Sequence, residues 1–208
     1  MPPSYPVTFS VDYPERPLNR LTTFFRIFTV IPIAILADLL PGGGLAAGHY
    51  GDATTVAIST GTVIFAPIVL MLLFRKKYPR WWYDWNLELL RFGNRIGVYL
   101  LLMDDEYPST DEQQAVHLDF AYPDVERLER ALPLVKWLLA IPHYIVLFFL
   151  YIGVFFAVIG AWFAILFTGR YPRGIFKFVE GTVRWHNRVI GYALTLVTDQ
   201  YPPFRLSP

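Results

Sequence analysis

Basic side chains at two recurring places are the strongest candidates for chemistry in this sequence. One place is near the start of an apolar stretch in each half of the chain. The other is a charged stripe at helical spacing further along each half. Cationic groups at such places bind lipid phosphates or an acidic residue of a partner subunit. The six candidates for contact with a lipid headgroup or a partner are Arg26, Lys136, Arg91, Arg95, Arg184 and Arg188. For Arg26 and Lys136 the favoured interpretation is a side chain that reaches back to the headgroup layer, because both positions are shallow.

Histidines in apolar surroundings suggest haem ligation or a structural role. His143 follows a proline inside an apolar stretch, and His186 lies on the amphipathic segment of the second half. Haem held between membrane helices needs two histidines at matching depth. The first half has Ile33 and Gly93 at the equivalent places, so it offers no second pair. A hydrogen-bonded structural histidine is therefore favoured over a haem ligand.

Carboxylates occur in two further clusters. Asp38 could share a glycine-rich loop with His49 and Asp52, but no fixed ligand spacing indicates a cation site, so a solvated cap is favoured. Residues 104–106 and 111–112 form an acidic segment around Pro108. Paired carboxylates do acid–base chemistry only in a pocket that separates their pKa values, so a solvated linker or a docking patch for a basic partner is favoured.

Several common mechanisms lack their starting residues. The chain has no cysteine, and it contains no P-loop, Rossmann fingerprint, H-E-x-x-H or G-x-S-x-G motif. Its formal net charge is only +1, far from the basic excess of a nucleic-acid binder. We therefore predict no catalytic residues, no metal, no cofactor and no nucleic-acid partner.

The composition indicates a chain that is solvated partly by lipid. Hydrophobic residues make up 54% of the 208 residues and charged residues 17%, against roughly 25% charged in a typical soluble domain. Apolar stretches near the length of a membrane span cover 24–40 and 56–74. The stretch 131–168 is long enough for two more spans that meet near 151–153. These stretches predict four spans in two helical hairpins.

Basic residues near these stretches predict the orientation. Arginines and lysines follow the second span at 75–80 and the fourth at 170–173, whereas the loops on the other side, 41–52 and 151–153, have none. Because such residues are retained on the cytoplasmic side, we expect a multi-pass protein with both termini in the cytoplasm.

The chain also resembles itself. Residues 7–36 are similar to 116–147, and residues 72–108 to 165–202, with Tyr-Pro pairs at matching places. This predicts two repeat units, 1–110 and 111–208. In each unit an alternating segment predicts a short strand, and these strands pair with each other or with the closing segments. An amphipathic segment such as 81–103 predicts a helix in the plane of the membrane. The predicted fold class is an all-α integral membrane protein with two tandem pseudo-symmetric units. Each unit holds a short β-strand, a transmembrane helical hairpin and an in-plane amphipathic helix.

Three segments of the second unit carry a family resemblance. LVKWLLAIPHYIVLFFL, AWFAILFTGRYPRGIFKF and RVIGYALTLVTDQYPPF are similar to the bacterial membrane proteins of domain-of-unknown-function family 4389. The first unit looks like a diverged copy. The resemblance implies a protein of the bacterial inner (cytoplasmic) membrane, and it implies no activity and no catalytic residue.

Together these features favour a non-enzymatic accessory or scaffold subunit that packs against other membrane proteins in a larger complex, in contact with membrane lipids. The alternative is a binder of a lipid- or quinone-type ligand, with headgroups held by the arginines of the charged stripes. A third possibility, an enzyme acting on lipid, requires His186 or the acidic linker to line a pocket.

Overall fold

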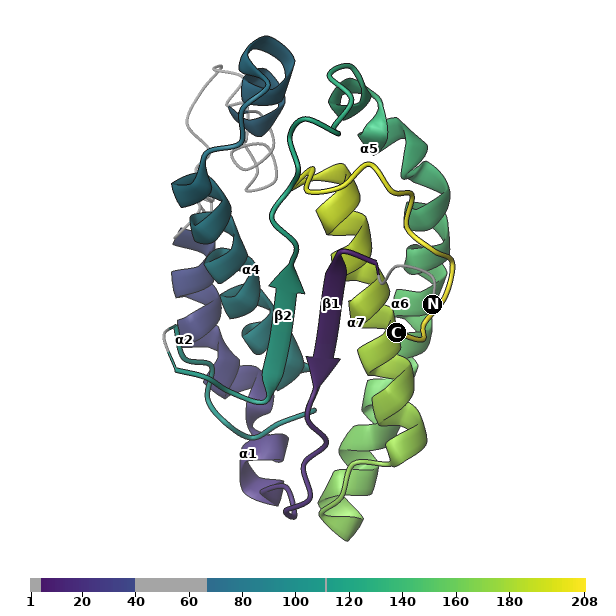
Figure 1. The fold of residues 1–208 in the computed structure, drawn as a ribbon. Helices are drawn as coiled ribbons and strands as arrows, with labels where there is room; N and C mark the ends of the chain where they lie inside the picture. Colours follow the sequence, from purple (N-terminus) through teal and green to yellow (C-terminus); the bar gives the residue numbers. More distant parts are fainter. Residues whose placement is uncertain (1–4, 40–66, 111) are drawn as a thin grey trace, which may run out of the picture.

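Two short antiparallel strands lie at the centre of the chain (Figure 1). The computed structural model describes residues 5–39, 67–110 and 112–208. Strand β1 (Val7–Val11) pairs with β2 (Val116–Phe120), with Val7 opposite Phe120 and Val11 opposite Val116. Alternate side chains of β1 are buried, as the alternating sequence predicts. The prediction of one strand in each half is confirmed, and of the two pairings left open the strands adopt the one with each other.

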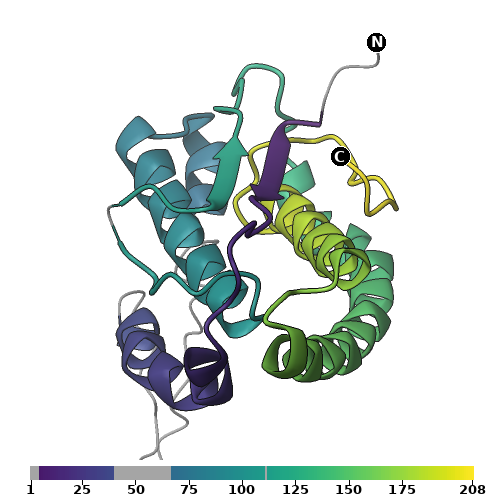
Figure 2. The same cartoon turned by 90° about the horizontal axis from the view of Figure 1, so that it is seen from below.

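Two long helices lie beneath this pair of strands (Figure 2). Helix α4 (Arg80–Leu100) and helix α7 (Arg173–Ala193) each begin directly after a Tyr-Pro pair, with the proline as the extended residue before the helix. Proline suits this place because its missing N–H would have no helical partner. Strand β1 packs on α7, and β2 packs on α4. Each strand therefore packs on the helix from the other half of the chain.

The close approach of β1 to α7 depends on a glycine. A Cβ atom at Gly191 would lie 2.6 Å from Val7 Cγ2, closer than carbon atoms can pack. Absence of a side chain at this position lets the strand lie directly on the helix. Substitution of Gly191 by alanine would push the two elements apart.

The outer layer consists of helices that cover α4 and α7. Helix α2 (Arg26–Leu39) lies beside α4, and helix α6 (Ile141–Thr168) lies along α7. Helix α1 (Arg20–Phe24) contacts α6 and α2. Short elements complete the described chain: the π-helical turn η1 (Met71–Arg75), the 3-10 turn η2 (Leu132–Leu134) and helix α5 (Lys136–Leu139).

The predicted hairpin in 131–168 is wrong. Residues Ile141–Thr168 form one continuous helix of 28 residues, which ends at Gly169 in the left-handed conformation. A single glycine inside a helix costs only about 1 kcal/mol. Gly153 therefore does not break α6, because the packing of α6 along α7 outweighs this cost. Within the described ranges, α6 is the one helix long and apolar enough to cross a membrane.

The predicted span 24–40 is also wrong. The chain turns at Phe25, so 24–40 is not one continuous helix, and the described part of α2 has 14 residues. Most of the predicted span 56–74 and the whole loop 41–52 lie outside the described residues. An all-α protein of two transmembrane hairpins is therefore contradicted. The location of both termini in the cytoplasm, which depended on an even number of spans, is therefore unsupported.

Helix α7 does not have the surroundings of an in-plane helix. A helix in the membrane interface exposes its charged face to water. Most side chains of α7 are buried instead, including Arg184 and Arg188 on its charged stripe. The stripe meets β1 and the C-terminal segment, as the contacts below show.

Candidate functional site: buried cations of the two halves

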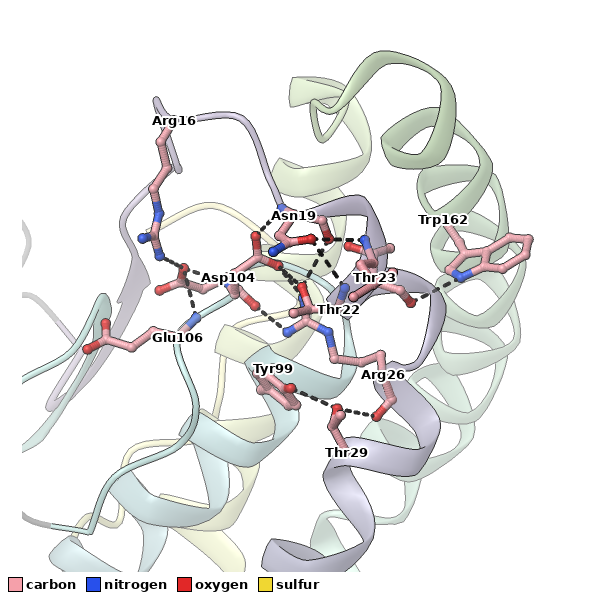
Figure 3. A network of polar contacts seen from close by, with 12 residues as sticks. Arg16, Asn19, Thr22, Thr23, Arg26, Thr29, Tyr99, Asp104, Glu106 and Trp162 are labelled. Carbon is pink, nitrogen blue, oxygen red and sulfur yellow. Dashed lines mark hydrogen bonds and ion pairs between the residues drawn. The ribbon is translucent and has the colours of Figure 1, made fainter.

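Arg26 lies inside the protein at the first residue of α2 (Figure 3). Its side chain is 2% exposed and forms an ion pair with the carboxylate of Asp105. A second guanidinium nitrogen donates to the backbone oxygen of Asp104 at 2.6 Å. The guanidinium carbon lies 4.0 Å from the centre of the Tyr99 ring, a distance at which a cation and a ring attract each other. Arg26 is thus held from three sides by its own chain.

The segment that binds Arg26 also fixes the start of α1. The carboxylate of Asp105 accepts hydrogen bonds from the backbone N–H of Asn19 and, at 3.5 Å, from the hydroxyl of Thr22. The neighbouring carboxylate of Asp104 pairs with Arg16 at 3.1 Å. Asp105 is therefore a structural anion with an exposed fraction of 12%, and the expectation of a solvated linker is wrong at this residue.

Lys136 has the same kind of surroundings in the second half. Its ammonium group lies 2.6 Å from the carboxylate of Asp199 and donates to the backbone oxygen of Thr198 at 2.8 Å. The nitrogen is 5.2 Å from the centre of the Tyr192 ring. Burial lowers the pKa of Lys136, and the hydrogen bond and charge of Asp199 oppose this shift. Lys136, like Arg26, does not reach outward to a headgroup layer.

The partners of these two cations were missed from the sequence, although a signal is present. Asp105 and Asp199 each lie two residues before a Tyr-Pro pair near the end of a half. Both carboxylates and both cations, Arg26 and Lys136, recur at matching places in the two halves. This recurrence predicts that each cation pairs with the carboxylate of its own half, provided that the acidic segment is not treated as a solvated linker. The carboxylates approach from a distant part of the chain, which is why spacing alone does not reveal the contact.

Arg184 joins α7 to β1 and to the C-terminal segment. Its Nε–H donates to the backbone oxygen of Phe9 at 2.7 Å, and another nitrogen donates to the oxygen of Leu206 at 2.9 Å. A third contact is the ion pair with Glu180 at 2.5 Å. Each of the three guanidinium nitrogens therefore donates to a partner within the chain.

Arg91 makes the matching contacts on α4. Its Nε–H donates to the backbone oxygen of Leu118 in β2 at 2.8 Å, and its guanidinium pairs with Glu88 and Asp119. The side chain is 29% exposed, so Arg91 lies nearer the surface than Arg184.

The remaining two arginines bind backbone oxygens of extended segments. Arg95 donates to Ser109 at 2.8 Å, and Arg188 donates to Arg205 at 3.2 Å and to Ser207 at 3.0 Å. Both side chains are buried. All six predicted contact residues therefore have partners within the chain, and all of them except Arg91 are buried.

Two asparagines link α4 and α7 at the middle of the fold. Asn94 Nδ2 donates to Asn187 Oδ1 at 3.0 Å, and Asn187 Nδ2 donates to Asn94 Oδ1 at 2.7 Å. Asn187 is fully buried. Because a buried amide without partners is costly, this reciprocal pair fixes the relative position of the two helices.

The histidines are placed separately. His143 accepts a hydrogen bond from Trp185 Nε1 at 3.0 Å and stacks on Phe204 with ring centres 4.0 Å apart, as expected of a structural histidine. His186 lies beside Tyr151, and burial lowers its pKa to about 4. Among the described residues, no group of three or more metal-binding side chains occurs. The side chains of Asp38, His49 and Asp52 lie outside the described residues.

Two grooves open beside α6. One, of about 380 Å³, lies between α1–α2 and α6 and is lined mainly by apolar side chains, with Thr23 and Arg26 in its wall. The other, of about 290 Å³, lies between α6 and α7 and includes His186, Tyr144 and Tyr151. Ligand pockets typically measure roughly 300–1,000 Å³, so the first groove is large enough for part of a small molecule or a lipid chain.

Comparison with known proteins identifies the second half. Residues 132–205 match the model of a family described as Domain of unknown function (DUF4389). This part of the chain belongs to that family, and the resemblance of its three segments is confirmed. No curated protein and no solved structure matches the chain. The interpretation of the first half as a second copy stays a prediction.

Proposed function

We propose that this protein is a non-enzymatic accessory or scaffold component of a bacterial membrane, which is attached through α6 and packs against other membrane proteins. The observation that carries the proposal is the apolar outer face of α6. Only 17% of its most apolar 18-residue stretch is buried inside the chain. A core helix of a water-soluble protein is mostly buried, so a nonpolar environment outside the chain is needed to cover this face.

Large aromatic side chains make up much of this face. They are 51–77% exposed along α6, and the set is Phe148, Phe149, Phe155, Phe156, Phe163 and Phe167. The neighbouring helices α1 and α2 add Leu21, Phe24, Ile27 and Phe28, each more than half exposed. Side chains of this size are costly in water, and both a lipid bilayer and the helices of a partner would cover them.

The chemistry of the interior supports a structural role. The six cations of the described chain that were candidates for binding hold backbone oxygens and carboxylates of the same chain. Such contacts position segments of the chain relative to one another. A formal net charge of +1 likewise gives no general attraction for nucleic acid.

Purification from native membranes tests the accessory role. The protein is extracted into polymer nanodiscs without prior detergent, and intact assemblies are analysed by mass spectrometry. We expect stoichiometric recovery with a larger membrane complex. Recovery of the chain alone, at the same yield from several expression levels, would contradict a role as an accessory subunit.

A second candidate function is binding of a lipid- or quinone-type ligand, and the grooves beside α6 favour it. The arginines that were expected to hold the headgroup, including Arg184 and Arg188, have internal partners. A headgroup needs other cations, and the end of α6 supplies them.

A further inference from the structure

The groove between α1–α2 and α6 has the shape and chemistry of a slot for a lipid chain. Its wall contains Phe24, Ile27, Phe155, Ile159 and Trp162, and the short segment at the end of α4 closes it from inside. Several of these side chains are also part of the exposed apolar face, since Ile27 is 72% and Phe155 63% exposed. The slot therefore opens onto the surface that a bilayer would cover.

Exposed cations lie beyond one end of this groove. Arg20 precedes Phe24 by one helical turn and so lies on the same side of α1. Its guanidinium donates to the backbone oxygen of Phe167 at 3.2 Å and lies against Gly169, where a Cβ would be 3.9 Å from its Nε. The next residue, Arg170, is exposed, and its side chain has no ion pair or hydrogen bond within the described part of the chain.

The two arginines are therefore brought together by the contact of α1 with the C-terminal end of α6, which both views of the fold show (Figures 1 and 2). Arg20 uses one of its five donors on Phe167, and Arg170 keeps all of its side-chain donors. Guanidinium groups bind phosphate through paired N–H donors. An apolar slot with two exposed arginines beyond its end, both with unused side-chain donors, is complementary to an anionic amphiphile.

We propose that the groove between α1–α2 and α6 binds one acyl chain of an anionic membrane phospholipid, whose phosphate is held by Arg20 and Arg170. This inference rests on the attachment of α6 to a membrane proposed above. A lipid is favoured over a partner helix because the two exposed arginines beyond the end of the groove complement a phosphate, while the apolar wall complements an acyl chain. The bound lipid joins α1 to α6, and with them the first half of the chain to the second.

The test measures retained phospholipid. Full-length protein in a mild non-ionic detergent is stripped of lipid, incubated with phosphatidylglycerol or phosphatidylcholine, and analysed by native mass spectrometry. We expect one phosphatidylglycerol per chain and weaker retention of phosphatidylcholine. Since one arginine near an anionic lipid contributes about 1 kcal/mol, each of Arg20→Gln and Arg170→Gln weakens binding about fivefold. Arg130→Gln, an exposed arginine before α5, is the matched control and leaves binding unchanged.

A second variant tests the groove itself. Val158→Phe fills the slot from α6, and Ile152→Phe places the same side chain on an exposed part of the helix that does not line it. We expect loss of retained lipid only for the first variant, with unchanged circular dichroism for both. The proposal is overturned if Val158→Phe retains as much phosphatidylglycerol as the wild type. It is also overturned if the combined variant Arg20→Gln with Arg170→Gln does so. Sedimentation with membranes and co-purification with a complex are scored separately, so failure of lipid retention is distinguishable from failure of the accessory role.

Discussion

Substitution of Asp105 by asparagine tests whether the buried cation sites hold the fold together. Asp105→Asn leaves the guanidinium of Arg26, which is 2% exposed, without its carboxylate. Removal of one partner of a buried ion pair costs about 3–5 kcal/mol. Because Asp105 is 12% exposed, we expect the lower end, about 3 kcal/mol. For a chain of this size 1 kcal/mol corresponds to roughly 2–4 °C in Tm, so the expected loss is about 6–12 °C.

The neighbouring residue provides a matched control. Asp104→Asn removes an equivalent charge, but its partner Arg16 is 63% exposed, and such surface pairs contribute about 0–1 kcal/mol. The assay is thermal unfolding followed by circular dichroism, in a mild detergent, with urea unfolding as a second measure. Equal losses for the two variants would refute the reasoning, because they would show that burial of the Arg26 pair does not determine its contribution. The double substitution Arg26→Met with Asp105→Asn should recover much of the loss, since it leaves no buried charge and keeps an acceptor for the backbone N–H of Asn19.

Three further variants test other parts of the interior. Asn187→Ala leaves the amide of Asn94 without its partner, so we expect a loss of about 1–3 kcal/mol in urea unfolding, and less than the sum of the single losses when Asn94→Ala is added. Burial lowers the pKa of His186 to about 4, so the folded state loses stability as the pH falls from about 6.5 through that value. His186→Phe should remove this loss of stability between about pH 6.5 and 4. An unchanged dependence of stability on pH in this range would contradict the assignment. Burial raises the pKa of Tyr78, whose hydroxyl donates to the backbone oxygen of Thr195 at 2.8 Å. Its contribution is complete below about pH 10 and is lost as the pH rises through the folded-state pKa, so Tyr78→Phe should flatten the alkaline limb of urea unfolding, and an equally steep limb would contradict the assignment.

Local patterns in the sequence predicted the local elements well. The alternation in 7–11 and 116–120 predicted both strands, and the Tyr-Pro pairs at 78 and 171 preceded the two long helices. These features depend on neighbouring residues only, through side-chain period and the backbone geometry of proline. The C-terminal family segment was identified on the same local basis.

The arrangement of these elements was not predictable in the same way. Hydrophobicity indicates that a segment is apolar, but it does not distinguish two short spans from the single helix Ile141–Thr168. That outcome depends on α7, which packs along α6 and stabilises it as one continuous helix. The exchange of strands between halves, with β1 on α7, likewise depends on contacts far apart in the sequence.

The role of the basic residues was misjudged for a related reason. The sequence shows no carboxylate near either cation in the chain, so Arg26 and Lys136 were expected to reach the headgroup layer. The structure supplies Asp105 and Asp199 from segments 79 and 63 residues further along the chain. A buried charge requires such a counter-charge, and the recurrence of both members in the two halves was the available signal.

Attachment through α6 is the central claim, and the depth of its outer face tests it most directly. The chain has no cysteine, so single cysteines at Phe156, 65% exposed on α6, and at Ser10, on the outer side of β1, can be labelled with a fluorophore. The protein is reconstituted into vesicles and exposed to a lipid-borne or a water-soluble quencher. The account predicts quenching of the label at 156 by the lipid-borne quencher only, and of the label at 10 by the water-soluble one. Quenching of both labels by the water-soluble quencher alone would contradict it.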